Sequence, residues 1–156
     1  MSDITASRPI RVLFVCTGNS ARSIMAESLL RKHGGVAFEV FSAGTDPRGV
    51  NPLTVRVLRE AGLPTADLSS KSVSQFLGQR FDYVITVCDQ ARQVCPVFPG
   101  SGKSLHWGYE DPAEATGSDE QRIKVFRAVF TQIGQRITQF AAIARRARAG
   151  EPVTIS

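Results

Sequence analysis

The sequence contains no apolar run near the 18 or more residues of a membrane-spanning helix, so no transmembrane segment and no membrane partner are expected. Its first nine residues are polar and lack the apolar stretch of a secretory signal peptide. These two absences predict a cytoplasmic protein.

Cysteine and histidine are scarce, with three of the former and two of the latter. No two cysteines have the C-x2-C spacing of a zinc site, and His33 and His106 have no metal-ligand spacing, so neither metal nor cofactor is expected. His33 is interpreted as a helix-end residue and His106 as structural, with Trp107 as either packing or a lid. In a reducing compartment, such cysteines are more often catalytic or redox-active than structural.

Aromatic residues make up only 8% of the chain and do not alternate with basic residues, which argues against a nucleic-acid partner despite the net charge of +5. The positive charge instead favours small anionic substrates or acidic partners. The one basic cluster, Arg145, Arg146 and Arg148, is interpreted as a solvated tail.

The length of 156 residues and the 42% content of hydrophobic residues fit one domain with one core. We expect a single domain over 1–156, with its core at about 9–142 between a polar N-terminal segment and a basic C-terminal tail. A monomer is expected.

Apolar runs alternate with helical patterns, which predicts a parallel α/β sheet. Asn51-Pro52 is a helix start, and Ser118 with Gln121 forms a capping box. We predict strands at about 10–16, 38–43, 83–87 and 103–106, and helices at about 23–33, 52–61, 73–77 and from 118, the last fraying before Gly150.

The most informative stretch is 12–23, where an apolar strand runs through a tight loop into a helix. Gly18 and Asn19 tolerate left-handed backbone angles, so the loop can turn sharply. Backbone N–H groups and the helix dipole then form a pocket for a tetrahedral oxyanion.

Cys16 and Arg22 give this pocket its chemistry. Arginine binds oxyanions through a planar fork of donors, and the positive surroundings stabilise the Cys16 thiolate as a nucleophile. The Ser23 hydroxyl is placed to donate to the sulfur. The alternative is a core cysteine and a surface arginine, but the strand, loop and helix together favour the anion site.

Cys88 also ends an apolar strand, and the carboxyl ends of parallel strands meet at one edge of a sheet. Cys88 should therefore lie near Cys16. If 88–95 is helical, Cys88 and Cys95 lie about 10 Å apart, beyond the roughly 7 Å limit of a disulfide. Spacing leaves two readings open: a segment that unwinds to form a disulfide, or two unrelated buried thiols.

The stretch 12–23 resembles the catalytic loop of the low-molecular-weight protein tyrosine phosphatase superfamily, which includes thioredoxin-coupled arsenate reductases. The resemblance implies a flavodoxin-like three-layer sandwich, with a four-stranded parallel sheet of order 2-1-3-4 and helices on both faces. It also implies Cys16 as nucleophile and Arg22 as oxyanion clamp. The implied substrate-binding residues are Thr17, Gly18, Asn19, Ser20, Ala21 and Arg22.

The segments around Cys88, Cys95-Pro96 and 106–113 are similar to those of the arsenate reductases. The resemblance implies that Cys16 attacks arsenate, that Asp111 is the general acid, and that Cys88 and Cys95 relay a disulfide to a thioredoxin-type reductant. Many of these reductases have a cysteine where this chain has Ala21, but that cysteine is outside the relay.

Two other functions stay open. One is a tyrosine phosphatase using Cys16, Arg22 and Asp111, although Ala113 and Glu114 stand where phosphatases usually carry aromatic residues. The other is a non-catalytic anion-binding or redox-sensing module. The alternative role of Asp111 is purely structural, as a turn residue before a proline.

Some of the resembling reductases bind potassium behind the loop. Asn19, Glu27 and Ser42 match three of the ligand positions, and Lys71 falls at about the fourth. The Lys71 ammonium either replaces the cation, bonding Asn19 and Glu27, or is exposed in a polar loop.

Overall fold

The computed structural model describes residues 8–156, so residues 1–7 of the polar N-terminal segment lie outside the described part. Four parallel strands form one sheet in the order β2-β1-β3-β4, which confirms the predicted topology. The strands are β1 (Ile10–Cys16), β2 (Phe38–Gly44), β3 (Tyr83–Thr86) and β4 (Lys103–His106). The α-helices are α2 (Arg22–Gly34), α3 (Pro52–Glu60), α4 (Asp89–Val94) and α5 (Asp119–Arg148), and the 3₁₀ turns are η1 (Gly35–Ala37), η2 (Val73–Phe76) and η3 (Pro112–Glu114).

Strand β1 is the centre of the core. Four consecutive residues, Val12 to Val15, have no exposed surface, because β1 pairs with β2 on one side and β3 on the other and is covered on both faces. This is the burial that a continuous apolar run predicts for a parallel strand.

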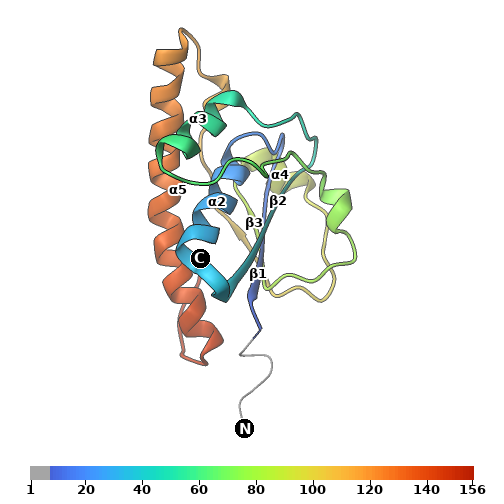
Figure 1. The fold of residues 1–156 in the computed structure, drawn as a ribbon. Coiled ribbons are helices and arrows are strands. Elements are labelled where there is room, and N and C mark those ends of the chain that lie inside the picture. Colours follow the sequence, from blue (N-terminus) through green and yellow to red (C-terminus); the bar gives the residue numbers. More distant parts are fainter. Residues whose placement is uncertain (1–7) are drawn as a thin grey trace.

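Helices α2 and α5 cover one face of the sheet, and α5 runs along the whole length of the molecule (Figure 1). Apolar residues of α5 at spacings of three and four are fully buried, as their period predicts: Ile123, Phe126, Val129, Ile133 and Ile137. A cluster of aromatic rings packs with η2: Phe41, Phe76, Phe81 and Phe98.

The C-terminal end of α5 differs from the prediction. The helix continues to Arg148 instead of fraying, and Ala144 is buried beyond the expected core limit at residue 142. Arg145 donates to the carbonyls of His33 and Gly34, and Arg148 pairs with Asp82 at 2.9 Å. Arg145 is exposed as expected, but it also bonds the carbonyls at the end of α2, and the partly buried Arg148 pairs with a carboxylate, so the tail is not purely solvated.

Trp107 is packing rather than a lid. Its ring is 2% exposed and contacts the rings of Phe14 and Phe140, with centroids 5.9 and 5.4 Å away. Both predicted helix starts are present, with Asn51 accepting from the Leu53 N–H and a complete capping box at Ser118. Within 8–156, no helix is long and apolar enough to cross a membrane.

Candidate active site

The sheet brings Cys16 and Cys88 to the same edge. Val15 of β1 pairs with Thr86 of β3, so the chain leaves both strands side by side at their carboxyl ends. Thr17 bridges the two segments, since its hydroxyl lies 3.4 Å from the Cys88 sulfur. Cys16 and Cys88 are both buried, with 2% and 3% of their surface exposed.

The loop after β1 curls back over the Cys16 sulfur. Asn19 has a φ of 44°, a left-handed angle that asparagine tolerates better than most residues, and its N–H donates to Cys16 Sγ at 3.2 Å. Gly44 lets the next strand approach closely, because a Cβ there would lie 2.5 Å from the Thr17 carbonyl oxygen. The backbone N–H groups of Asp46 and Arg48 donate to the loop carbonyls of Thr17 and Gly18.

A short hydrogen-bond chain reaches the Cys16 sulfur. Ser23 Oγ lies 2.8 Å from Cys16 Sγ and also accepts from the Asn19 side-chain amide at 2.7 Å. Because the amide is the donor in that bond, the single Ser23 hydroxyl proton is available to the sulfur. The geometry matches the expectation that Ser23 donates to Cys16.

Helix α2 begins at the loop with free N–H groups. Its N-cap is Ala21, which has no side-chain oxygen, and its first turn carries no acidic residue. An anion placed over Cys16 would therefore face uncapped backbone donors and the positive end of the helix dipole.

Arg22, the first residue of α2, reaches the other wall of the site. Its Nη1 donates to the Tyr109 carbonyl at 3.1 Å, and its Nη2 lies 3.4 Å from Asp111 Oδ2. Only 12% of the Arg22 side chain is exposed. The guanidinium is thus held in place, between the loop and the carboxylate.

Asp111 is both a turn residue and a site residue. Its Oδ1 accepts from the Ala113 N–H and caps η3, while its Oδ2 faces Arg22 in the cleft. The side chain is 31% exposed, so the carboxyl can exchange protons with solvent. The turn role of Asp111 is confirmed, and its second carboxylate oxygen faces Arg22 in the cleft.

These groups share a cleft of about 600 Å³. All the predicted substrate-binding positions line it except Asn19, which lies beneath the loop with no exposed surface. The lining residues are Cys16, Thr17, Gly18, Ser20, Ala21, Arg22, Arg48, Gly49, Val50, Asn51, Pro52, Cys88, Asp89, Gln90, Tyr109, Asp111, Ala113 and Glu114.

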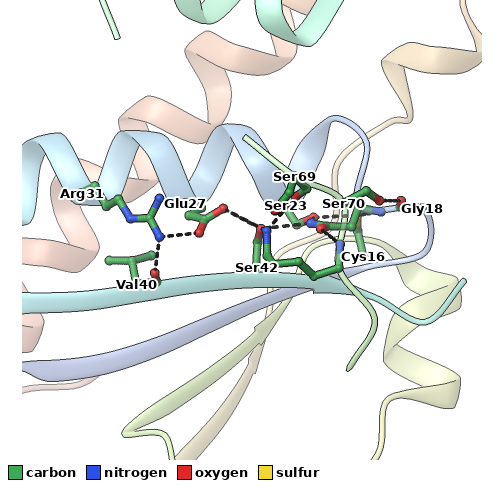
Figure 2. A network of polar contacts seen from close by, with 11 residues as sticks. Cys16, Gly18, Ser23, Glu27, Arg31, Val40, Ser42, Ser69 and Ser70 are labelled. Carbon is green, nitrogen blue, oxygen red and sulfur yellow. Dashed lines mark hydrogen bonds and ion pairs between the residues drawn. The ribbon is translucent and has the colours of Figure 1, made fainter. Parts of the chain in front are cut away.

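Behind the loop, a polar network joins α2 to β2 (Figure 2). Ser42 accepts from the Asn19 amide at 3.0 Å and donates to Glu27 at 2.7 Å. Glu27, whose side chain is 5% exposed, also pairs with Arg31 at 2.7 Å.

Lys71 lies beside this network. Its ammonium is 3.8 Å from Glu27 Oε1 and donates to the Ser69 carbonyl at 2.7 Å. The ammonium was expected to bond Asn19, but the backbone N–H of Lys71 makes that hydrogen bond instead. Burial lowers the pKa of Lys71, and the nearby Glu27 opposes that shift. The Lys71 ammonium therefore faces the Glu27 carboxylate behind the loop.

Cys88 and Cys95 cap opposite ends of the same helix. Cys88 is the N-cap of α4, and its sulfur accepts from the Ala91 N–H at 3.4 Å, while Cys95 is the C-cap. Both thiols are free, and the six residues of α4 stand between them. Cys95 is partly exposed, and burial raises the pKa of its thiol.

The sequence did not single out several residues of this region. Arg48 and Gln90 line the cleft, and Tyr109 supplies the carbonyl that holds Arg22. Arg48 and Gln90 follow the carboxyl ends of β2 and β3, which is the signal that could have identified them. Thr86, Asp89 and His106 form a further hydrogen-bonded chain next to Cys88.

A doubly wound parallel sheet with a thiol, an arginine and helix N–H groups at its carboxyl edge defines a thiol-dependent oxyanion enzyme. The sequence matches the low molecular weight phosphotyrosine protein phosphatases over residues 11–149. The protein belongs to that family.

Its relatives include arsenate reductases. The arsenate reductase of Halalkalibacterium halodurans is 44% identical over 130 residues, which are 83% of this chain and 94% of the relative. A solved arsenate reductase in the phosphate-binding state superimposes with a TM-score of 0.73 at 29% identity, over 85% of this chain and 97% of that one. A thioredoxin-dependent arsenate reductase of Corynebacterium glutamicum is 31% identical with a TM-score of 0.58, over 86% of this chain and 64% of that one.

Proposed function

We propose that this protein reduces arsenate to arsenite, using Cys16, Cys88 and Cys95 as a disulfide relay. The observation that carries the proposal is the placement of the three thiols. The Thr17 hydroxyl connects Cys88 to the anion loop, which comprises residues 16–22. Cys88 and Cys95 cap the two ends of the six-residue helix α4. The naming of the relatives as arsenate reductases supports it.

The first two steps take place in the cleft. Arsenate binds to the loop N–H groups and Arg22, and the Cys16 thiolate attacks arsenic. A sulfur–arsenic bond forms, and an arsenic–oxygen bond breaks as Asp111 protonates the leaving oxygen, which departs as water. The Cys88 thiolate then attacks Cys16 Sγ. The electron pair of the sulfur–arsenic bond stays on arsenic, which leaves as arsenite, and the two sulfurs are oxidised to a disulfide.

The last steps move the disulfide outward. The Cys95 thiolate attacks Cys88 Sγ and releases the Cys16 thiolate, which requires α4 to unwind because a disulfide needs Cα atoms within roughly 7 Å. A thioredoxin-type dithiol then reduces the Cys88–Cys95 disulfide. Since the cycle starts from three free thiols, we place the enzyme in the reducing cytoplasm. We further propose that it acts as a single-domain monomer and without nucleic acid.

A coupled assay tests this proposal. The protein is mixed with arsenate, thioredoxin, thioredoxin reductase and NADPH, and NADPH oxidation is followed at 340 nm. We expect sustained, arsenate-dependent turnover that stops when thioredoxin is left out. A protein that is inert to arsenate but hydrolyses phosphotyrosine rapidly would contradict the proposal and support the phosphatase.

Hydrolysis of phosphate esters is the second candidate function. The family is described as phosphatases, and phosphate has the shape and charge of arsenate, so Cys16, Arg22 and Asp111 can attack either anion. The rim of the cleft carries Ala113 and Glu114, which offer no aromatic surface to a phosphotyrosyl ring. We therefore expect a weak phosphatase activity that is independent of Cys88 and Cys95.

Lys71 supplies the positive charge behind the loop in place of a metal ion. The melting temperature of the wild type should be equal in potassium and in sodium chloride at matched ionic strength. Lys71→Ala should lower the stability by about 1–2 kcal/mol, less than the roughly 3–5 kcal/mol of a fully unpaired buried charge, because Glu27 keeps Arg31 and Ser42.

The control for this prediction is Lys32→Ala, at an exposed position of α2, which should leave the melting temperature unchanged. A potassium-specific rise in the melting temperature of the wild type would contradict the built-in cation. So would a Lys71→Ala variant as stable as the wild type.

A further inference from the structure

A hydrogen-bonded chain of three side chains links the residues that precede and follow Cys88 in the sequence. His106, at the end of β4, has its Nε2 2.8 Å from Asp89 Oδ1 and its Nδ1 2.8 Å from Thr86 Oγ1. Thr86 stands two residues before Cys88, and Asp89 directly follows it. The His106 imidazole, on the neighbouring strand β4, is therefore hydrogen-bonded to one residue before Cys88 and to one after it.

The acceptor character of Asp89 fixes the roles of the ring atoms. An ionised carboxylate only accepts hydrogen bonds, so Nε2 carries a proton and donates to Asp89. In the neutral ring, Nδ1 then accepts from the Thr86 hydroxyl. In the charged ring, Nδ1 donates to Thr86, whose hydroxyl can turn to the Leu105 carbonyl, 3.4 Å away. The bridge is complete in either protonation state.

The two ends of α4 are held differently. At the start, His106 anchors Asp89, and the Cys88 sulfur accepts from the Ala91 N–H. At the end, the Cys95 N–H donates to the Ala91 carbonyl, and Pro96 cannot continue the helix. Beside this end is a second hollow of about 510 Å³, lined by Thr86, Arg92, Cys95 and His106 among others. The helix can thus open from Cys95 while its first residue stays fixed.

We infer that His106 is a positioning residue for Cys88, holding it against the anion loop through Asp89 and Thr86 for its attack on Cys16. This role rests on the proposed relay, because only the relay uses Cys88. His106 contacts neither the anion loop nor Arg22 in the interactions described above, so it does not enter the first attack by Cys16.

A direct test measures how accessible Cys88 is, without arsenate. In a Cys16→Ser/Cys95→Ser background, Cys88 is the only thiol, and its alkylation by iodoacetamide is followed by mass spectrometry. His106→Ala should speed alkylation roughly tenfold, because a charge-assisted bond that holds the buried Cys88 is lost. Asp89→Ala, at an exposed side chain, should have the same effect and provides a second variant if His106→Ala folds poorly.

Two isosteric variants separate the arms of the bridge. His106→Gln places an amide near the Nε2 position and keeps the arm to Asp89, so slow alkylation should be restored. His106→Asn places it near Nδ1 and keeps only the arm to Thr86, so alkylation should stay fast. His33→Ala, the other histidine, should match the background variant. An unchanged rate in both His106→Ala and Asp89→Ala would overturn the role of His106.

The second readout is catalytic. In a Cys95→Ser background, His106→Ala should slow the single release of arsenite roughly tenfold, while phosphatase activity stays within about twofold. An equal fall of both activities would show a general structural role and overturn the inference. If the wild type released no arsenite while His106→Ala still exposed Cys88, the relay would be wrong and the positioning of Cys88 would stand.

Discussion

Cys16→Ser is expected to abolish both arsenate reduction and phosphate ester hydrolysis, by a factor on the order of 10⁴ or more. Cys16 is the one thiol at the centre of the anion loop, where the Asn19 N–H and the Ser23 hydroxyl face its sulfur. Serine keeps the shape, but its hydroxyl stays protonated at neutral pH and is a far weaker nucleophile.

The control for this prediction is anion binding. Since the loop N–H groups and Arg22 are unchanged, Cys16→Ser should still bind phosphate, as measured by calorimetry, and should melt within a few degrees of the wild type. A serine variant that still turned over arsenate would contradict the assignment of Cys16 as the nucleophile.

Cys88→Ser is expected to separate the two activities. Arsenate reduction should fall at least 10³-fold, because the adduct on Cys16 then has no neighbouring thiolate to take up the oxidation. Phosphatase activity should remain within a few-fold of the wild type, because water resolves the phosphocysteine and Asp111 and Arg22 are untouched. The two rates are measured on one preparation, with arsenate in the coupled assay and with an aryl phosphate.

Ser23→Ala is the matched comparison for Cys88→Ser. It removes the hydroxyl beside Cys16, so both activities should fall together. A Cys88→Ser enzyme that kept its arsenate turnover would remove Cys88 from the relay. A Cys88→Ser enzyme that lost phosphatase activity in parallel would indicate a structural role for this cysteine.

The strands and helices could be predicted because apolar patterns and helix-start residues in the local sequence indicated the same elements. Residues 10–16 are continuously apolar and become the central strand, and the Asn51-Pro52 and Ser118–Gln121 starts are both present. The family resemblance implied the sheet order. The position of Cys16 and Cys88 at one edge was predicted without the resemblance, because the carboxyl ends of parallel strands meet at one edge of a sheet.

The parts that could not be predicted depend on contacts between distant segments. Arg145 looked like a solvated residue because nothing in its neighbourhood reveals the carbonyls of His33 and Gly34. Likewise, no local pattern places His106 against Asp89, since their pairing depends on the register of β4 beside β3. At Lys71, the backbone N–H rather than the ammonium reaches Asn19, a choice that the side-chain type alone does not determine.

The most direct test of the relay is the product of a single turnover by Cys95→Ser. With excess arsenate and no reductant, this variant should release about one arsenite per protein and stop. Peptide mapping should then find Cys16 and Cys88 joined in one disulfide, since no third thiol remains to open it. Repeated turnover of Cys95→Ser with thioredoxin, or an arsenite burst without a Cys16–Cys88 disulfide, would contradict the mechanism.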